Sequence, residues 1–427
     1  MTGAARMTGN RPTLVTTLKS VWTLLFGIGL LMLANGLQGS LLGVRAESEG
    51  FDPTVIGLIM SGFFAGILLG SQWTPQAVRL VGHVRVFAAM AAIASVAILL
   101  HVLFVNELAW WVMRLVTGFC YAGIFIVAES WLNDRAPQET RGQVLALYMA
   151  VTFAGMGGGQ LLLNLASSRA ADLFMLVSVL ISLAVVPLLL RSTPLPASES
   201  GLPVSVRRLA AASPLGLVSV FVAGIANGTI FGMGAVYARS AGFSVPETSL
   251  FMALIILGAA TLQWPIGRLS DHVDRRLVIT GVTILAAVAC MLTMNLDGID
   301  SARAVVLVVL TGGFSLSIHS LALAYTNDYL APEEMVGASS ALVLVLGLGS
   351  ICGPIVVGLL FAVVGPPGFF LWLAASHASL AGFAFWRMTR RETPPVDEQA
   401  PYVPAPLQGT ELSTAVAEEV TLETERA

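Results

Sequence analysis

Two charged residues, Arg114 and Glu129, lie in a stretch of the chain that is otherwise mostly apolar, from Trp110 to Trp131. A charge inside a bilayer costs from about 3 to more than about 10 kcal/mol, so a chain keeps one there only with a partner or a function. A guanidinium can bind an anionic or carbonyl-bearing solute by charge-assisted hydrogen bonds. A carboxylate in a low-dielectric wall can take up a proton near neutral pH.

Helical spacing relates these two charges to one another. Arg114, Gly118, Tyr121 and Phe125 follow a 4-3-4 pattern, which predicts one helix face, and Glu129 comes four residues later. At about 1.5 Å per residue, Arg114 and Glu129 are about 22 Å apart along the axis, so they cannot pair directly. The alternatives to a chemical role are that Arg114 extends to the outer interface and that Glu129 anchors the inner helix ends.

The composition indicates an integral membrane protein. Of the 427 residues, 56% are hydrophobic and only 11% are charged, against about 25% charged residues in soluble domains, and the mean hydropathy is +0.83. A membrane-spanning helix needs about 20 mostly apolar residues. Such runs lie at residues 20–43, 55–77, 85–105, 108–131, 143–166, 171–190, 214–236, 247–267, 277–296, 304–325, 338–364 and 367–388.

Basic residues predict the orientation, because short cytoplasmic loops carry the excess of Lys and Arg. With the N-terminus inside, 17 of the 22 basic residues are cytoplasmic and 4 are outside, while Arg114 is in the membrane. We therefore expect a multi-pass protein of the bacterial cytoplasmic membrane with both termini in the cytoplasm. We read the first apolar run as a retained helix, since no small-residue cleavage site follows it.

Several classes of function find no support in the sequence. The cysteines Cys120, Cys290 and Cys352 fall inside predicted spans, where they act as small hydrophobic residues and suggest no metal site. A phosphate-binding G-x-x-x-x-G-K-[ST] loop is missing, which argues against an ATP-driven pump. With a net charge of -3, no catalytic constellation and no cofactor motif, neither nucleic-acid binding nor an enzyme is expected.

The two halves of the chain repeat one another at an offset of about 192 residues. Ala34-Asn35-Gly36 recurs as Ala226-Asn227-Gly228, and Asn133-Asp134 recurs as Asn327-Asp328. We predict an all-α membrane protein with twelve transmembrane helices in two pseudosymmetric six-helix bundles. Its parts are an N-terminal cytoplasmic segment (1–19), the first bundle (20–190), a cytoplasmic linker (191–213), the second bundle (214–388) and a cytoplasmic disordered tail (389–427).

A motif follows the predicted span 247–267. The segment from Gln263 to Arg276 resembles the G-x-x-x-D-[RK]-x-G-[RK]-[RK] loop of the major facilitator superfamily, in which these residues bind helix ends across the two halves when the cytoplasmic side is shut. The matching positions are Gly267, Asp271, Arg275 and Arg276, while His272 and Asp274 depart from the pattern. In the first half Pro75 and Arg79 replace the glycine and the aspartate, and Gly82 is retained.

Three further stretches carry the same resemblance. Arg114 to Gly118 is similar to the R-x-x-x-G motif linked to proton coupling, and Asp134 to Gly142 is similar to the acidic-x-x-P-x-x-x-R-G inner loop of sugar porters. The run TLQWPIGRL and the segment ESWLND resemble the YcaD-like branch of the superfamily. The resemblance implies a major facilitator fold and a cytoplasmic gate that contains Asp134 and Arg141 beside the motif of the second half.

In that superfamily the spans equivalent to 20–43, 108–131, 214–236 and 304–325 line a central cavity at the membrane midplane. Helical spacing then selects the side chains that can face it. The candidate substrate-binding residues are Asn35, Gln38, Arg114, Tyr121, Asn227, Phe231, Ser315 and His319. Histidine titrates near physiological pH, so Glu129 and His319, with Arg114, are candidates for proton coupling; helix packing is the alternative for His319 and for the aromatic residues.

The resemblance therefore implies a secondary active transporter that moves a small organic solute by alternating access. Proton coupling is one option for its energy source. The alternatives are an uncoupled facilitator and a transporter-like sensor that binds solute without transport. The expected partners are a small-molecule substrate, the lipid bilayer and protons, and we expect the protein to act as a monomer.

Overall fold

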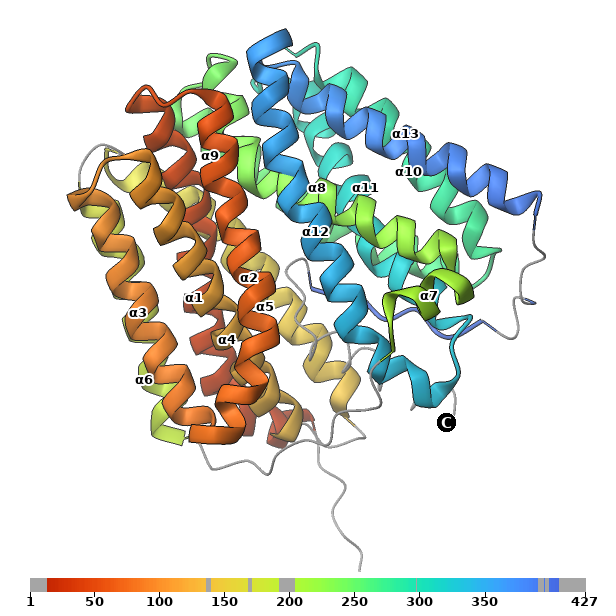
Figure 1. Cartoon of the computed structure of the whole chain (residues 1–427), viewed down its shortest axis with the longest axis horizontal. Coiled ribbons are helices and arrows are strands. Elements are labelled where there is room, and N and C mark those ends of the chain that lie inside the picture. Colours follow the sequence, from red (N-terminus) through yellow and green to blue (C-terminus); the bar gives the residue numbers. More distant parts are fainter. Residues whose placement is uncertain are drawn as a thin grey trace, which may run out of the picture.

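The computed structural model describes residues 14–135, 140–167, 171–191, 204–296, 298–390, 395 and 399–406. Within these ranges the regular elements are helices (Figure 1). The first half contains α1 (Leu14–Ser48), α2 (Pro53–Val81), α3 (His83–Leu103), α4 (Glu107–Arg135), α5 (Arg141–Leu161), the 3-10 helix η2 (Leu162–Leu165) and α6 (Asp172–Arg191). The second half contains α7 (Val206–Ala212), α8 (Pro214–Ser240), α9 (Val245–Ser270), α10 (Arg275–Thr293), α11 (Ala302–Asn327), α12 (Pro332–Val364) and α13 (Gly368–Met388).

The twelve long helices among these elements confirm the predicted twelve-helix fold. Eleven of the described helices are long and apolar enough to cross a membrane, and α6 has a shorter apolar part, Asp172–Pro187. The predicted spans each fall on one long helix to within a few residues. Outer and inner ends below are those that the basic residues predict.

The predicted linker ends in a short helix. The predicted linker 191–213 contains the short helix α7, which begins where the Ser205 side chain accepts a hydrogen bond from the Arg208 backbone N–H at 3.2 Å. The Arg208 side chain then pairs with Glu334, in the first turn of α12, at 3.1 Å. A side-chain cap and an ion pair therefore attach the end of the linker to the second half.

Close helix packing repeats in the two halves. A Cβ atom at Gly118 of α4 would lie 2.0 Å from the carbonyl oxygen of Phe63 on α2, and one at Gly312 of α11 would lie 2.2 Å from that of Ile255 on α9. Only a residue without a Cβ atom permits this approach. The same holds between α1 and α5, and between α8 and α12.

These contacts also fix the register of the repeat. Between α2 and α9 the offset is 192 residues (Phe63 to Ile255), but between α4 and α11 it is 194 (Gly118 to Gly312). His319 of α11 therefore corresponds to Phe125 of α4, two residues before the position that a uniform offset predicts. The difference arises because the loops of the two halves differ in length.

The outer end joins the two halves. At Gly57 of α2 a Cβ atom would lie 2.3 Å from the carbonyl oxygen of Pro354 on α12. Glu47 of α1 pairs with Arg239 of α8 at 3.7 Å. Toward the inner end α2 and α12 diverge (Figure 1). These contacts place the described halves together at their outer ends.

Candidate functional site

Arg114 is buried between the helices of the first half, with only 3% of its surface exposed. Its guanidinium lies 4.3 Å from the centre of the Phe63 ring, a cation–π contact worth up to about 2 kcal/mol when it is shielded from water. Within the described ranges no carboxylate pairs with Arg114, and its Nε has no hydrogen-bond partner. The side chain therefore does not extend to the outer interface, and its charge is only partly compensated.

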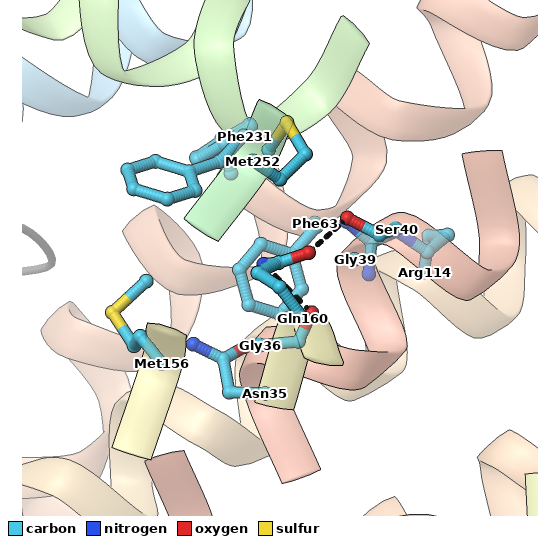
Figure 2. A pocket seen from close by; sticks show the side chains of 11 residues that line it. Asn35, Gly36, Gly39, Ser40, Phe63, Arg114, Met156, Gln160, Phe231 and Met252 are labelled. Atoms are coloured by element: carbon cyan, nitrogen blue, oxygen red, sulfur yellow. Dashed lines mark hydrogen bonds between the residues drawn. The ribbon is translucent and has the colours of Figure 1, made fainter. Parts of the chain in front are cut away.

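A small cavity borders Arg114 at the contact between the two halves (Figure 2). Residues of α1, α2, α4, α5, α8 and α9 surround it. They are Asn35, Gly36, Gly39, Ser40, Phe63, Phe64, Arg114, Met156, Gln160, Phe231 and Met252. About 20 Å³ of it is open to the centres of water-sized molecules, which is room for about one water. An organic solute enters this space only if the surrounding helices move apart.

Gln160 of α5 orders the polar side of this cavity. Its Nε2 donates to the backbone carbonyl oxygen of Gly36 at 3.0 Å, and its Oε1 accepts a hydrogen bond from the Ser40 hydroxyl. Neither Gln160 nor Ser40 was among the predicted substrate-binding residues. Gln160 could have been identified as a lone glutamine in an apolar run. Ser40 could not, because a serine in a membrane helix is common.

Three of the predicted substrate-binding residues, Asn35, Arg114 and Phe231, line the cavity together. Tyr121 lies behind the Phe63 ring, 5.9 Å away between ring centres. Gln38 is 1% exposed and lies outside the lining, as does Asn227. The structure therefore brings together members of α1, α4 and α8, as helical spacing predicted, and leaves others in the surrounding packing.

The two candidates on α11 lie elsewhere. Ser315 is fully buried, with its hydroxyl 3.0 Å from His377 Nε2 on α13. His319 lies beside the backbone carbonyl of Pro406, in the C-terminal segment. Neither residue lines the cavity beside Arg114.

Glu129 is hydrogen-bonded by a tyrosine of α5. The hydroxyl of Tyr148, on α5, donates to Glu129 Oε1 at 2.5 Å, and the carboxylate is only 5% exposed. The structure thus joins Glu129 to Tyr148 on α5, while His319 lies beside Pro406.

The motif of the second half forms an ion-pair cluster at the inner end. Arg275 is fully buried and pairs with Asp328 at 2.6 Å and Asp271 at 3.2 Å. Arg276 pairs with Asp274 at 2.8 Å. All of these partners belong to the second half. Burial raises the pKa of Asp328 to about 6, although Arg275 acts in the opposite direction.

In the first half, Asp134 takes the position of Asp328, and the loop that follows it is only partly described. Asp134, at the end of α4, is exposed, and Arg141 begins α5 half-buried. Pro137, which the loop motif also contains, lies outside the described residues. The inner ends of the two halves are therefore unlike each other, with an exposed aspartate in one and a buried ion-pair cluster in the other.

Comparison with known proteins identifies the relatives of this chain. Residues 24–215 and 216–418 each match the model of the Major Facilitator Superfamily. An uncharacterized MFS-type transporter YcaD of Escherichia fergusonii is 28% identical over 341 residues, which cover 79% of this chain and 87% of that protein. An uncharacterized MFS-type transporter of Yersinia pestis is 27% identical over 395 residues, 90% of this chain and 98% of the relative.

Among solved structures, the nucleoside transporter NupG is similar to this chain with a TM-score of 0.71 and 16% identity. The alignment covers 87% of this chain and 100% of NupG. At this identity the likeness concerns the fold, and it confirms the predicted architecture. The double match of the family model agrees with the internal repeat of glycine contacts.

Proposed function

The chain belongs to the Major Facilitator Superfamily, in its YcaD-like branch, and is a membrane transporter; we propose that it moves a small organic anion across the bacterial cytoplasmic membrane by alternating access. Arg114 is the reason for proposing an anion as the substrate. It is a buried cation without an acidic partner among the described residues, and it borders the cavity between the halves. A carboxylate or phosphate that entered there would supply the missing charge through a charge-assisted hydrogen bond.

The polar lining is suited to the rest of such a solute. Asn35 and Gln160 provide amide groups on two sides of the space, and Phe231 provides an aromatic face from the second half. Most transporter sites lie where two repeats meet, because rocking of the repeats exposes that place to each side in turn. In the proposed cycle the cavity widens when the inner end opens and the solute enters. Closure of the inner end then brings Phe231 back onto the solute.

Proton coupling is the energy source that we propose. Glu129 is buried at the inner half of α4 and is held by Tyr148. A carboxylate that binds a proton in one state and releases it in the other would couple solute movement to the proton gradient. His319, on α11, remains a second proposed carrier. Further parts of the proposal are cytoplasmic termini, a monomeric transporter and a gate formed by the ion-pair cluster of Arg275.

Thermal unfolding of the purified protein in the presence of organic anions, cations and neutral solutes tests the charge of the substrate. We expect anions alone to raise the unfolding temperature, and Arg114→Gln to remove that increase. Stabilisation by cations or neutral solutes in both proteins would contradict the proposed role of Arg114.

Counterflow in proteoliposomes tests transport itself. The anion that stabilises the protein should enter vesicles preloaded with the unlabelled form. Binding without counterflow would instead favour the solute sensor. Accumulation of the anion that does not change with an imposed pH gradient would favour the uncoupled facilitator.

A further inference from the structure

The C-terminal residues Gln399–Pro406, called the tail strap below, lie against the inner end of the second half. Figure 1 shows this segment, in dark blue, reaching from the second half toward the middle of the molecule. Ala400 and Ala405 are 3% and 1% exposed, so the strap is embedded in the protein. The structure thus describes these residues against the second half, within the tail that the sequence predicts to be disordered. They contain three prolines and one tyrosine, and their backbone groups are bonded by side chains of the second half.

The first part of the tail strap binds the ion-pair cluster. The backbone N–H of Ala400 donates to Asp328 at 3.1 Å, and its carbonyl accepts from Arg275 at 2.8 Å. The backbone N–H of Tyr402 donates to Asp271 Oδ1 at 2.8 Å. Arg275 and Asp271 belong to the gate motif, and Asp328 pairs with Arg275, so the strap uses the groups that the motif would offer to another helix end.

The second part of the tail strap binds polar residues of α9 and α11. The backbone N–H of Ala405 donates to the Ser320 hydroxyl at 3.0 Å, and the carbonyl of Ala405 accepts from Gln263 Nε2 at 3.1 Å. His319 lies beside the carbonyl of Pro406. Gln263, Ser320 and His319 are all buried. Gln263 also donates to the Ser320 hydroxyl at 2.6 Å, so the extended peptide backbone adds hydrogen bonds to a polar pair between α9 and α11.

The tyrosine ring fills the place that Gly267 leaves open. A Cβ atom at Gly267 would lie 2.1 Å from a ring carbon of Tyr402, so the ring rests directly on the backbone of α9. Its hydroxyl lies beside Ser320 and Gln263 without a well-aligned hydrogen bond to any described residue. Packing of the ring, and not its hydroxyl, therefore holds this residue.

The tail strap covers the side of α9 that faces the first half. At the outer end Ser249 donates to the backbone carbonyl of Gln160 on α5 at 2.8 Å, and Ile256 contacts Gly157 of α5. Gly267 follows Ser249 by 18 residues and Ile256 by 11, or about five and three turns, which returns it to nearly the same side of the helix. The side of α9 that meets α5 at the outer end is thus the side that Tyr402 occupies at the inner end.

We propose that the tail strap is an autoinhibitory element, which occupies the inner surface of α9 that α5 must contact when the inner end closes. A segment that binds only one of two conformations shifts the population toward that conformation. Docking of the strap therefore holds the protein with its outer end shut, and release of the strap permits the outward-facing state. The inference rests on alternating access, but not on the charge of the solute.

Accessibility of the outer contact tests this inference without any substrate. Ser249→Cys places a thiol in that contact, where Ser249 is fully buried, and a membrane-impermeant maleimide added from outside reacts only when the contact opens. Adding Tyr402→Ala should accelerate the reaction at least about fivefold. Without the ring the strap no longer docks, so it no longer favours the form with its outer end shut. Adding Tyr402→Phe, the matched control, should leave the rate unchanged. Protein without Ser249→Cys gives the background of the native cysteines.

Amide hydrogen exchange tests the docking itself. The amides of Ala400, Tyr402 and Ala405 should be protected in the wild type and in Tyr402→Phe, and exposed in Tyr402→Ala. Rapid exchange of these amides in the wild type would show that the strap does not dock. Equal maleimide rates in the two double variants, despite lost protection in Tyr402→Ala, would show that the docked strap does not control access. Counterflow measured on Tyr402→Ala separates either failure from a failure of the proposed transport.

Discussion

Helices α4 and α11 occupy equivalent places in the two halves, with the same packing and different chemistry. Gly118 and Gly312 bring each helix against a backbone carbonyl of its neighbour. In the register that these glycines set, Val308 stands opposite Arg114, and both are buried. The close contact between helix backbones is thus present in both halves, because the same helices must pack together in each. Arg114 has no charged counterpart on α11, so of these two helices only α4 gives the cavity a cation.

The same comparison holds further along the two helices. Leu323 of α11 takes the position of Glu129, and His319 takes that of Phe125. Both positions are buried in both halves. A duplicated fold therefore supplies two equivalent sets of buried positions, and sequence divergence in one set is enough to create a polar site without disturbing helix packing.

The largest effect that we expect comes from removing the cation that borders the cavity, Arg114. Arg114→Gln should lower the counterflow of an anionic solute by about 100-fold, because a charge-assisted bond of about 2–3 kcal/mol is lost. Val308→Ala, at the equivalent position of α11, should leave the rate per folded molecule nearly unchanged. Retention of more than a tenth of the wild-type rate by Arg114→Gln would remove the functional difference between α4 and α11.

A stability measurement tests the shared packing. Gly118→Val and Gly312→Val should each destabilise the protein by about 1–3 kcal/mol, because the added side chain collides with a backbone carbonyl. The expected result is a similar fall in the thermal unfolding temperature of both variants. Gly281→Val on α10 is the control, since a Cβ atom there meets no atom within 4 Å. Markedly unequal losses in the two halves would contradict equivalent packing.

Accumulation in a pH gradient tests the role of Glu129. Glu129→Gln should abolish pH-driven accumulation but leave solute exchange intact, because the amide cannot bind and release a proton. One coupled proton supports about tenfold accumulation per pH unit. Tyr148→Phe, which removes the hydrogen bond and keeps the carboxyl group, should reduce accumulation only in part. Normal accumulation by Glu129→Gln would exclude this residue from the proton path.

The smallest effect concerns the inner ends. Because the pKa of Asp328 is raised to about 6 in the folded protein from its ordinary 3.8, the folded state binds a proton more tightly than the unfolded state. Its contribution to stability thus grows as pH falls from about 7 toward 4, and is lost as pH rises through 6. Asp328→Asn should reduce this pH dependence of thermal unfolding by on the order of 1 kcal/mol. Asp134→Asn, at the exposed equivalent position, should leave it unchanged.

The helices and the repeat were predictable because their signals are local. An apolar run of about 20 residues identifies a span wherever its neighbours pack, and the recurrence of Ala-Asn-Gly reports the repeat directly. Arg114 was also predictable as a buried charge, since its cost in the membrane does not depend on the identity of its neighbours. Its distance from Glu129 followed from the helix rise alone.

The partners of these residues were not predictable in the same way. Glu129 meets Tyr148 and His319 meets Pro406 because of how α4, α5 and α11 are rotated and which helices they contact. The tail strap lacks an apolar run or helical period, so composition alone suggested disorder. Its order depends on hydrogen bonds to Asp271, Asp328 and Ser320, which come from distant parts of the sequence.

The sequence by itself determined the number of spans, the duplicated plan and the presence of a buried cation at Arg114. These features follow from hydropathy, repetition and the cost of charge burial, which act within a single helix. Only the tertiary structure decided that Arg114 borders a cavity with Asn35 and Phe231, and that Tyr402 covers Gly267. Such contacts depend on the mutual rotation and spacing of helices, which arise when the side chains of the whole molecule pack together.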